Sequence, residues 1–510
     1  MPKASHIDLI VVLVYLAGVT LVGCMMSRRT KTAAEFITAG GSLPGWVVGL
    51  SIIGTFVSSI SFVANPGHTY SGTWIPFVFS LSLPYAALIA TVYFVPFFRN
   101  CGSVSAYEHL ENRFGAWSRI YSALFNVMYH LGRIGTILWG VSLAVSALID
   151  VPISVIIVAL GVLVIVYTLL GGIEAVIWTD VVQSIILIGG MLLCLFVLLD
   201  RVPGGFFGVI DGAHTDTENK LSLGSMQLTF ASKTFWTTLL FGFFINLQNF
   251  AADQTYVQRY FTARSEHEAR RSVWMGAIAY IPISAILFFI GTGLFVFYQS
   301  TGSLPPGTDP DRVLPYFIIS ELPTGLAGLL IAAILAAAMS TVDSSLNSSA
   351  TLLLCDVWRR FLNPLEIAHD GTPIKNDHAD LRFLRLMTLT LGVVGIAVAL
   401  VLAQTEGMLK VWWTISGVLS GGTLGLLILA RFTSAVGTRG AATGVVLGVL
   451  SITAISVAHI EKPASWLKPV CDALSPVTGW FHPLMAIVVG TSVVFVVGAL
   501  FSKHEAGRSN

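Results

Sequence analysis

Charged residues are scarce in this sequence: only 11% of its 510 residues are Asp, Glu, Lys or Arg, whereas a typical soluble domain has about 25%. Its polar segments are short, the longest being about 200–234, 300–323 and 355–382, and none carries a phosphate-binding loop, a zinc-ligand cluster or a nucleophile elbow. The five cysteines are scattered and odd in number, so they predict neither a disulfide framework nor a metal site. These absences exclude a soluble globule, a disordered chain and a nucleic-acid-binding protein. They also argue against an ATP-driven pump and against an enzyme.

Apolar residues fill most of the chain, since Ala, Val, Ile, Leu, Met, Phe, Trp, Tyr and Cys make up 55% of it. A helix that spans a bilayer needs roughly 20 apolar residues, so this content could supply about thirteen spans. Apolar runs occur at about 7–26, 45–64, 75–98, 118–148, 153–171, 174–199, 235–252, 272–299, 324–354, 383–403, 411–430, 440–460 and 480–501. We therefore predict an all-α polytopic membrane protein with about 13 transmembrane helices.

The loop charges predict the orientation in the membrane. Of the 28 Lys and Arg residues, roughly 19 fall in one set of alternating loops, which includes Arg28, Arg259 and Arg359, and roughly 8 fall in the other set, which includes Lys220. Positive residues concentrate on the cytoplasmic side. We expect the N-terminus outside, the C-terminus in the cytoplasm and a location in the plasma (inner) membrane. The run Ile7–Met26 is followed by Arg28, Arg29 and Lys31, a charge order that is typical of an uncleaved anchor with its N-terminus outside rather than of a signal peptide.

Two apolar runs contain small and hydroxyl-bearing residues that loosen a helix or line a cavity. Residues 49–61 read GLSIIGTFVSSIS and residues 336–345 read AAAMSTVDSS. In the second stretch Ala337, Ser340, Thr341 and Ser344 follow the i, i+3, i+4, i+7 spacing and share one helical face. A row of hydroxyl oxygens suits a hard cation such as Na⁺. The alternatives are a close-packed helix contact and serines that bond back to their own helix.

Three charged residues fall inside apolar runs, where an ionisable side chain indicates a functional site. They are Arg133, Asp180 and Asp343. Asp180 could instead lie near the wet interface, and Arg133 could bind either an anionic substrate or an acid of the protein. Polar residues near the end of the 235–252 run could line the same cavity or bond one helix to another: Asn246, Gln248, Asn249, Asp253 and Gln254.

Several stretches together resemble the sodium/solute symporter family, which includes sodium–glucose, sodium–proline, monocarboxylate and bacterial sialic acid transporters. The matching residues are Lys31–Phe36, Pro44–Trp46, Ser105–Glu108, Gly171–Gln183, Val257–Tyr260 and Ala336–Ser349. The likeness extends from the first span to about residue 430. It is greatest to the bacterial sialic acid transporters, especially over 31–74 and 129–183.

The resemblance implies a LeuT-type core of two inverted five-helix repeats, with binding sites at mid-membrane between broken helices. The expected parts are an extra N-terminal helix (1–30), a first repeat (45–199), a second repeat (235–430) and C-terminal extra helices with a short tail (431–510). It also implies a first sodium site, which maps onto backbone carbonyls of Gly54, Val57 and Ala337 and the hydroxyls of Ser340 and Thr341. Many members have Ala in place of Gly54, a harmless change if only the carbonyl binds.

A second sodium site, found in some members, maps onto Asp180, Ser340, Asp343 and Ser344. Asp343 departs from the family pattern, in which a hydroxyl residue is usual. An extra carboxylate could tighten ion binding, carry a proton or point elsewhere. We predict two Na⁺ ions for each substrate molecule.

The resemblance maps the arginine that holds the carboxylate of sialic acid onto Arg133. Ser58 and Ser61 match polar substrate contacts, whereas Phe56 and Ser80 depart from them. Phe56 removes a hydroxyl and Ser80 shortens an amide-bearing side chain. We add Phe243 and Asn246 as substrate-binding candidates.

The predicted function is Na⁺-coupled uptake of a carboxylate-bearing solute such as sialic acid by alternating access, with a neutral sugar as the alternative. A channel or a sensor on the same fold is less favoured. The expected partners are the small-molecule substrate and the lipid bilayer, with no nucleic acid and no obligatory protein partner.

Overall fold

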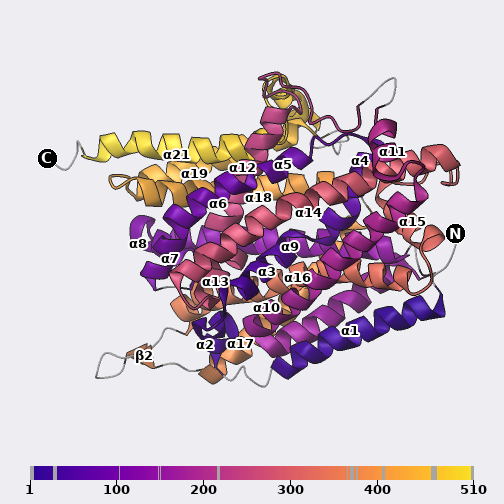
Figure 1. The fold of residues 1–510 in the computed structure, drawn as a ribbon. Coiled ribbons are helices and arrows are strands. Elements are labelled where there is room, and N and C mark those ends of the chain that lie inside the picture. The colour runs from indigo at the N-terminus through magenta and orange to yellow at the C-terminus, as the bar shows by residue number, and fades with distance from the viewer. Residues whose placement is uncertain are drawn as a thin grey trace.

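The structure is a computed structural model that describes residues 5–26, 32–102, 104–146, 149, 151–214, 219–363, 366–367, 373–374, 377–404, 408–460 and 468–506. It consists almost entirely of helices (Figure 1). The described strands are two residues each, β1 (Glu366–Ile367) and β2 (Pro373–Ile374), and they pair antiparallel. The all-α prediction is therefore confirmed.

The first half of the chain begins with a long peripheral helix and continues with several broken ones. Its elements are α1 (His6–Met26), α2 (Ala33–Thr38), η2 (Ala39–Gly41), α3 (Gly45–Phe56), η3 (Ile60–Ala64), α4 (Asn65–Ser71), α5 (Phe77–Leu81), α6 (Leu83–Ile89), η4 (Ala90–Phe94), α7 (Val95–Cys101), α8 (Glu108–Phe114), α9 (Ala116–Ser146), α10 (Ile153–Arg201) and α11 (Gly205–Gly212).

The second half has longer uninterrupted helices. Its elements are α12 (Phe235–Ala251), α13 (Gln254–Thr262), α14 (Glu266–Thr301), η5 (Pro310–Arg312), α15 (Val313–Glu321), α16 (Leu326–Leu352), η6 (Leu353–Leu362), α17 (Asp377–Leu402), α18 (Met408–Phe432), α19 (Thr438–Ala458), α20 (Lys468–Leu474), η7 (Ser475–Gly479) and α21 (Met485–Ala506).

Each of the predicted apolar runs coincides with a helix or with a group of helices joined end to end. Within the described residues, 8 helices are long and apolar enough to cross a membrane, or up to 9 if the bent pair Gly45–Phe56 and Ile60–Ser71 counts as one span. The predicted count of thirteen is therefore not confirmed, although the multi-pass character is. The start of α1 and the end of α21 lie at opposite ends of the bundle (Figure 1).

Three interruptions shape the interior. The helix axis bends by 57° between α3 and the segment that continues into α4, as the glycines and hydroxyls of that run predicted. The chain also breaks between α12 and α13, where Ala252 leaves the helical region. Gly172 splits α10 with φ 61° and ψ −162°, a conformation that glycine adopts without a Cβ penalty. A Cβ at Gly172 would lie 2.9 Å from the backbone of Phe36.

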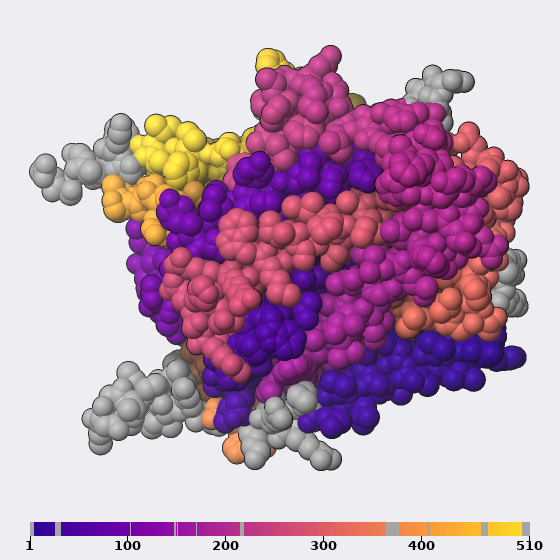
Figure 2. Space-filling model, in the orientation of Figure 1, coloured from indigo at the N-terminus to yellow at the C-terminus, as the bar shows by residue number. Residues whose placement is uncertain are grey.

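Helix α16 forms the centre of the molecule and α1 lies on its edge. The apolar window of α16 is 89% buried, whereas that of α1 is 22% buried, and α1 runs along the outside of the bundle in Figure 2. Helix α16 packs against α1, α3, α9, α10 and α17. Its hydroxyl-bearing face is therefore surrounded by protein on all sides.

One charge assignment from the sequence is wrong. Arg259, counted among the loop residues, is fully buried on α13. Its charge faces no water, and the cost of burying it is offset by pairing with Asp180 inside the protein. Other basic residues used for the orientation lie outside the described residues, namely Lys3, Arg28, Arg29, Lys31, Lys375, Lys462 and Arg508.

Candidate functional site

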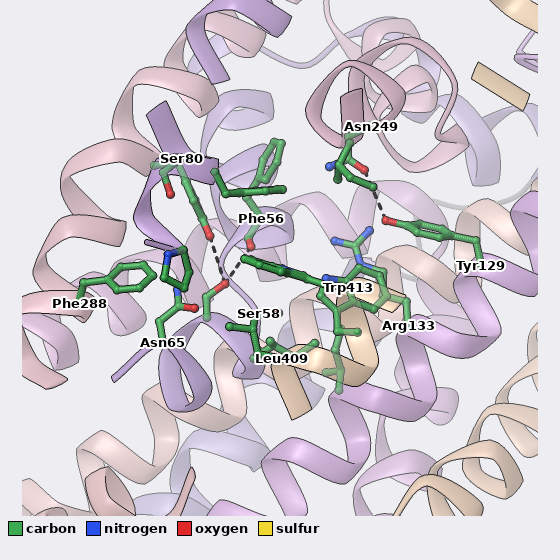
Figure 3. A pocket seen from close by; sticks show the side chains of 18 of the residues that line it. Phe56, Ser58, Asn65, Ser80, Tyr129, Arg133, Asn249, Phe288, Leu409 and Trp413 are labelled. Atoms are coloured by element: carbon green, nitrogen blue, oxygen red, sulfur yellow. Dashed lines mark hydrogen bonds between the residues drawn. The ribbon is translucent and has the colours of Figure 1, made fainter. Parts of the chain in front are cut away.

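A polar and aromatic pocket lies where the break after α3 faces α9, α12, α14 and α18 (Figure 3). The space in it that is open to the centre of a water molecule is about 80 Å³. Pockets for small organic ligands usually measure about 300–1,000 Å³, so a sugar-sized ligand requires this pocket to widen. Its walls include Phe56, Ser58, Ser61, Asn65, Phe79, Ser80, Tyr129, Arg133, Asn249, Tyr256, Tyr280, Phe288, Leu409, Trp412 and Trp413.

Arg133 is the cationic side chain of this pocket. It projects from the middle of α9 and is 6% exposed. Its Nη2 donates to the carbonyl of Thr55 at 2.8 Å, next to the break after α3. Its Nη1 has no hydrogen-bond partner among the described residues and lies 3.7 Å from Oδ2 of Asp253. The guanidinium also faces the Trp412 ring at 6.0 Å. Arg133 therefore keeps unused hydrogen-bonding capacity beside a cavity.

The structure brings five of the predicted substrate residues together and leaves two outside. Phe56, Ser58, Ser61, Ser80 and Arg133 all line the pocket. Asn246 is not among the lining residues and donates to Ser82 Oγ at 2.9 Å, and Phe243 is not among them either. Helix α12 contributes Ile245 and Asn249 instead.

The two departures from the sialic acid pattern both contact α14, Phe56 at Tyr280 and Ser80 at Ser284. Phe56 belongs to an aromatic cluster, with ring centroids 4.9 Å from Tyr256 and 5.6 Å from Tyr280. Ser80 shares a hydrogen bond of 2.8 Å with Ser284. The pocket therefore combines aromatic rings with small hydroxyl side chains.

The residues of the predicted first sodium site come from the end of α3 and from the centre of α16. These helices touch at Gly54, where an added Cβ would lie 2.9 Å from Ser340 Oγ. Val57, directly after α3, has φ −86° and ψ 93°, so the helix ends there and the carbonyls of this turn are released. Thr341 donates to the Ala337 carbonyl at 3.1 Å. Carbonyl and hydroxyl oxygens thus gather on both sides of the contact between the helices.

The predicted second sodium site is built around Asp180. This fully buried carboxylate on α10 accepts hydrogen bonds from Ser51 and Ser340. Arg259 Nη2 donates to Asp180 at 2.9 Å and to Ser344 at 2.6 Å. Three of the four predicted residues, Asp180, Ser340 and Ser344, are therefore adjacent, and the guanidinium of Arg259 holds them together.

Asp343 accepts no hydrogen bond from Arg259, Ser51 or Ser340 and has other partners. Its carboxylate accepts from the Tyr167 hydroxyl at 2.8 Å and from the backbone N–H of Ser344 at 2.6 Å. Tyr167 lies on α10 before the break at Gly172, while Asp180 follows it. Asp343 thus satisfies its oxygens on a neighbouring face of α16, as the angle of about 60° from Ser340 allowed.

Sequence reasoning did not assign a role to Arg259 and underrated Asp253. Asp253 caps the start of α13 and lies 3.1 Å from Nε2 of His130. The sequence did contain a signal. Arg259 belongs to the family motif Val257–Tyr260, and this motif lies within ten residues of the polar cluster that contains Asp253. The signal was missed because α13 is short and lacks a long apolar run, so its sequence reads as a loop.

Known proteins resemble this chain in sequence and in fold. A profile of the sodium:solute symporter family matches residues 36–448. The sodium/sialic acid symporter SiaT of Proteus mirabilis (strain HI4320) is 34% identical over 450 residues, which covers 86% of this chain and 87% of that protein. The sodium/sialic acid symporter NanT of Aliivibrio fischeri (strain ATCC 700601 / ES114) is 30% identical over 490 residues, covering 95% and 92%.

Solved structures share the fold. The substrate-bound outward-open state of a Na⁺-coupled sialic acid symporter superposes with a TM-score of 0.86 at 29% identity, covering 98% of both chains. Mhp1, a nucleobase-cation-symport-1 family transporter, superposes with a TM-score of 0.53 at 14% identity, covering 94% of this chain and 96% of that one, which supports the fold alone. The predicted LeuT-type architecture is thereby confirmed.

Proposed function

Because the chain belongs to the sodium:solute symporter family, we propose that this Na⁺-coupled transporter takes up a carboxylate-bearing sugar such as sialic acid, and that Arg133 binds the carboxylate. It is a secondary transporter and not an enzyme. The observation that carries the substrate proposal is the unbonded Nη1 of the buried Arg133, which faces a pocket with hydroxyl and aromatic walls.

The chemistry of Arg133 favours a carboxylate over a neutral group. A guanidinium presents a planar fork of donors that matches the two oxygens of a carboxylate. Inside a protein such a charged pair is stronger than in water. The two relatives with 34% and 30% identity carry sialic acid in their names, which supports the same class of substrate here.

We propose that two Na⁺ ions accompany each substrate. The oxygens around Gly54, Val57, Ala337, Ser340 and Thr341 would hold the first ion. Asp180, Ser340 and Ser344 would hold the second, with Asp343 one residue away from Ser344. Ser340 belongs to both sets and donates its hydroxyl to Asp180, so the two ions would share a ligand.

A thermal-shift screen of the purified protein tests the function. N-acetylneuraminic acid should raise the melting temperature in NaCl and not in KCl or choline chloride, because a ligand that binds only the folded state stabilises it by mass action. Glucose, lactate and proline serve as the neutral-sugar, monocarboxylate and amino-acid arms. Stabilisation by glucose and not by the acid would reject the carboxylate proposal.

The proposed orientation places the N-terminus outside and the C-terminus in the cytoplasm, in the plasma (inner) membrane. The charge bias between loops supports it. Cys101, which is exposed, would then face the cytoplasm, whereas Ser303 would face outside. An impermeant maleimide should label a Ser303→Cys variant carrying Cys101→Ser in intact cells. It should label native Cys101 only after the cells are opened, and the reverse pattern would refute the orientation.

A further inference from the structure

Two buried ion pairs lie at opposite ends of the short helix α13, and we propose that this helix couples the substrate site to the second cation site. Asp253 at its start takes the place of a substrate carboxylate beside Arg133. Arg259 near its end takes the place of a sodium ion beside Asp180. The inference deepens the proposed function and rests on the roles given there to Arg133 and Asp180.

At the anionic end, Asp253 and Arg133 form an incomplete pair. Oδ2 of Asp253 and Nη1 of Arg133 are 3.7 Å apart, and neither atom has a hydrogen-bond partner among the described residues. Asp253 is fully buried, so its charge neutralises Arg133 without occupying the fork of donors. Oδ1 of Asp253 stays with His130 at 3.1 Å. A substrate carboxylate could therefore bind Arg133 while Asp253 remains paired with His130.

At the cationic end, Arg259 fills the place that a cation would take. Its Nη2 donates to both Asp180 and Ser344, at 2.9 and 2.6 Å, and its Nε donates to Ser51 at 2.9 Å. Asp180 and Ser344 are two of the proposed ligands of the second Na⁺. An ion that enters this site must therefore displace the guanidinium, at least in part.

The two ends are joined by a continuous chain of hydrogen bonds along α13. The backbone N–H of Thr255 donates to Oδ1 of Asp253 at 2.8 Å, and Nη1 of Arg259 donates to the Thr255 carbonyl at 2.7 Å. The helix has only nine residues and follows the break at Ala252. From Asp253 to Arg259 the helix rises about 9 Å. A segment this short moves as one body when either end is released.

The consequence is positive linkage between the substrate and the second ion. A substrate carboxylate that binds Arg133 removes the contact between Arg133 and Asp253, one of those that hold α13 in place. Arg259 then leaves Asp180 more easily, and Na⁺ binds there more tightly. By thermodynamic reciprocity, Na⁺ at Asp180 strengthens binding of the carboxylate by the same factor. A neutral substrate would not compete with Asp253 and would not produce this linkage.

The variant Asp253→Asn tests the anionic end. Asparagine keeps an oxygen that can cap α13 and removes the charge that competes for Arg133. We expect the Kd of N-acetylneuraminic acid, measured by calorimetry in saturating Na⁺, to fall about tenfold or more, since close charge pairs are commonly worth at least that. The Kd of its C1 carboxamide should stay within about twofold.

A matched control is Asp380→Asn. Asp380 is also a buried acid, paired with Arg359 at 2.7 Å, but it belongs to the contact between η6 and α17. This variant should change neither Kd. If Asp253→Asn alters the acid and the amide equally, its role is structural and the inference is wrong.

The linkage itself is measured by the half-saturating Na⁺ concentration with and without substrate. In the wild type the acid should lower this concentration at least about threefold, and in Asp253→Asn the ratio should shrink by half or more. An unchanged ratio in Asp253→Asn overturns the coupling by α13. Absence of any Na⁺-dependent binding of the acid to the wild type would instead refute the proposed function, so the two failures can be told apart.

Discussion

Arg133 and Arg259 are both buried arginines, but they differ in how fully their donors are used. All three guanidinium nitrogens of Arg259 donate to protein groups. Arg133 uses Nη2 for the Thr55 carbonyl and leaves Nη1 unbonded. A buried donor without a partner costs about 1–3 kcal/mol. A ligand that supplies the missing acceptor recovers that energy, so Arg133 is suited to bind a ligand and Arg259 is suited to hold helices together.

The first prediction concerns Arg133→Lys. An ammonium group is a compact charge that lacks the planar fork, so it cannot serve the Thr55 carbonyl and a carboxylate with the same geometry. We expect the Kd of N-acetylneuraminic acid to rise at least about tenfold, which corresponds to a loss of about 1.4 kcal/mol. Calorimetry in saturating Na⁺ measures it. Arg201→Lys, at a half-exposed pair with Glu321, is the control, and unaltered affinity in Arg133→Lys would contradict the carboxylate assignment.

The second prediction concerns the partner of Asp343. Tyr167→Phe removes the hydroxyl that donates to this buried carboxylate and should destabilise the folded protein by about 1–3 kcal/mol, because an unsatisfied buried acceptor remains. The control is Tyr121→Phe, since the Tyr121 hydroxyl has no hydrogen-bond partner among the described residues. Thermal melting in detergent should show a lower midpoint for Tyr167→Phe alone. Equal midpoints would show that the hydrogen bond to Asp343 contributes nothing.

At the scale of elements, hydropathy predicted the apolar helices well but did not predict the polar helix α13. The runs of the sequence coincide with α1, α9, α14, α16 and the other long helices, because lipid and a protein core both select apolar side chains. The bend after α3 was also predictable, since glycines and hydroxyls weaken a helix at that point. Residue spacing put Ser340 and Ser344 on one face of α16, and both contact the Asp180–Arg259 pair. Burial does not single out this face, because every residue from Ala336 to Ser349 is buried.

Helix α13 shows what the sequence could not reveal. Its residues include Gln254, Thr255, Gln258 and Arg259, all fully buried, and their composition is that of a loop. Their partners are far away in the chain, as with Arg259 and Asp180, 79 residues apart. A hydropathy argument takes into account only the free-energy cost of burying a polar side chain in its local sequence. It does not include the hydrogen bonds to acids and carbonyls far away in the sequence that offset this cost.

The third prediction concerns the contact between α3 and α16. A Cβ on Gly54 would lie 2.7 Å from Ser184 Oγ and 2.9 Å from Ser340 Oγ, so Gly54→Ala must rotate Ser340 away from Asp180 or separate the helices. We therefore expect Gly54→Ala to raise the half-saturating Na⁺ concentration about three- to tenfold, a cost of about 0.7–1.4 kcal/mol. This steric argument predicts a cost, whereas the sequence led us to expect that alanine at position 54 is harmless if only the backbone carbonyl binds the ion.

The matched control is Gly18→Ala on α1, because nothing lies within 4 Å of a Cβ at that position. Sodium titration of the thermal midpoint serves for both variants. A Gly54→Ala protein that titrates like the wild type would mean that the serines rotate freely and that Ser340 does not bind the ion through its hydroxyl.

At the scale of the whole molecule, the fold separates a buried core from helices that face lipid. Helix α16 carries the polar face at the centre, while α1 exposes apolar side chains such as Leu13 and Val14, at 64% and 66%. Every site residue therefore lies within the protein, where water is scarce and charges interact strongly. Transport requires this interior to open to one side at a time, and the narrow pocket around Arg133 is consistent with a form in which access is restricted.

The last prediction is the charge moved in each transport cycle. A Na⁺ ion that enters down about 100 mV gains roughly 2.3 kcal/mol, and a tenfold concentration gradient adds about 1.4 kcal/mol. A monoanion that enters loses the electrical term of one ion. With one Na⁺ the cycle is electroneutral and sustains only about tenfold accumulation, whereas two Na⁺ leave about 5 kcal/mol, enough for accumulation of several thousandfold.

Two ions would therefore be required to concentrate a scarce anionic solute, and the two proposed sites share Ser340, whose hydroxyl donates to Asp180. We expect a reversal-potential measurement in proteoliposomes with N-acetylneuraminic acid to give one net positive charge for each substrate molecule. Arg259 stays attached to α13 and adds nothing to this charge, so a value of zero would mean that its guanidinium permanently replaces the second Na⁺ at Asp180. In that case Arg259→Gln should convert the transporter from an electroneutral to an electrogenic one, because the vacated site would then accept an ion.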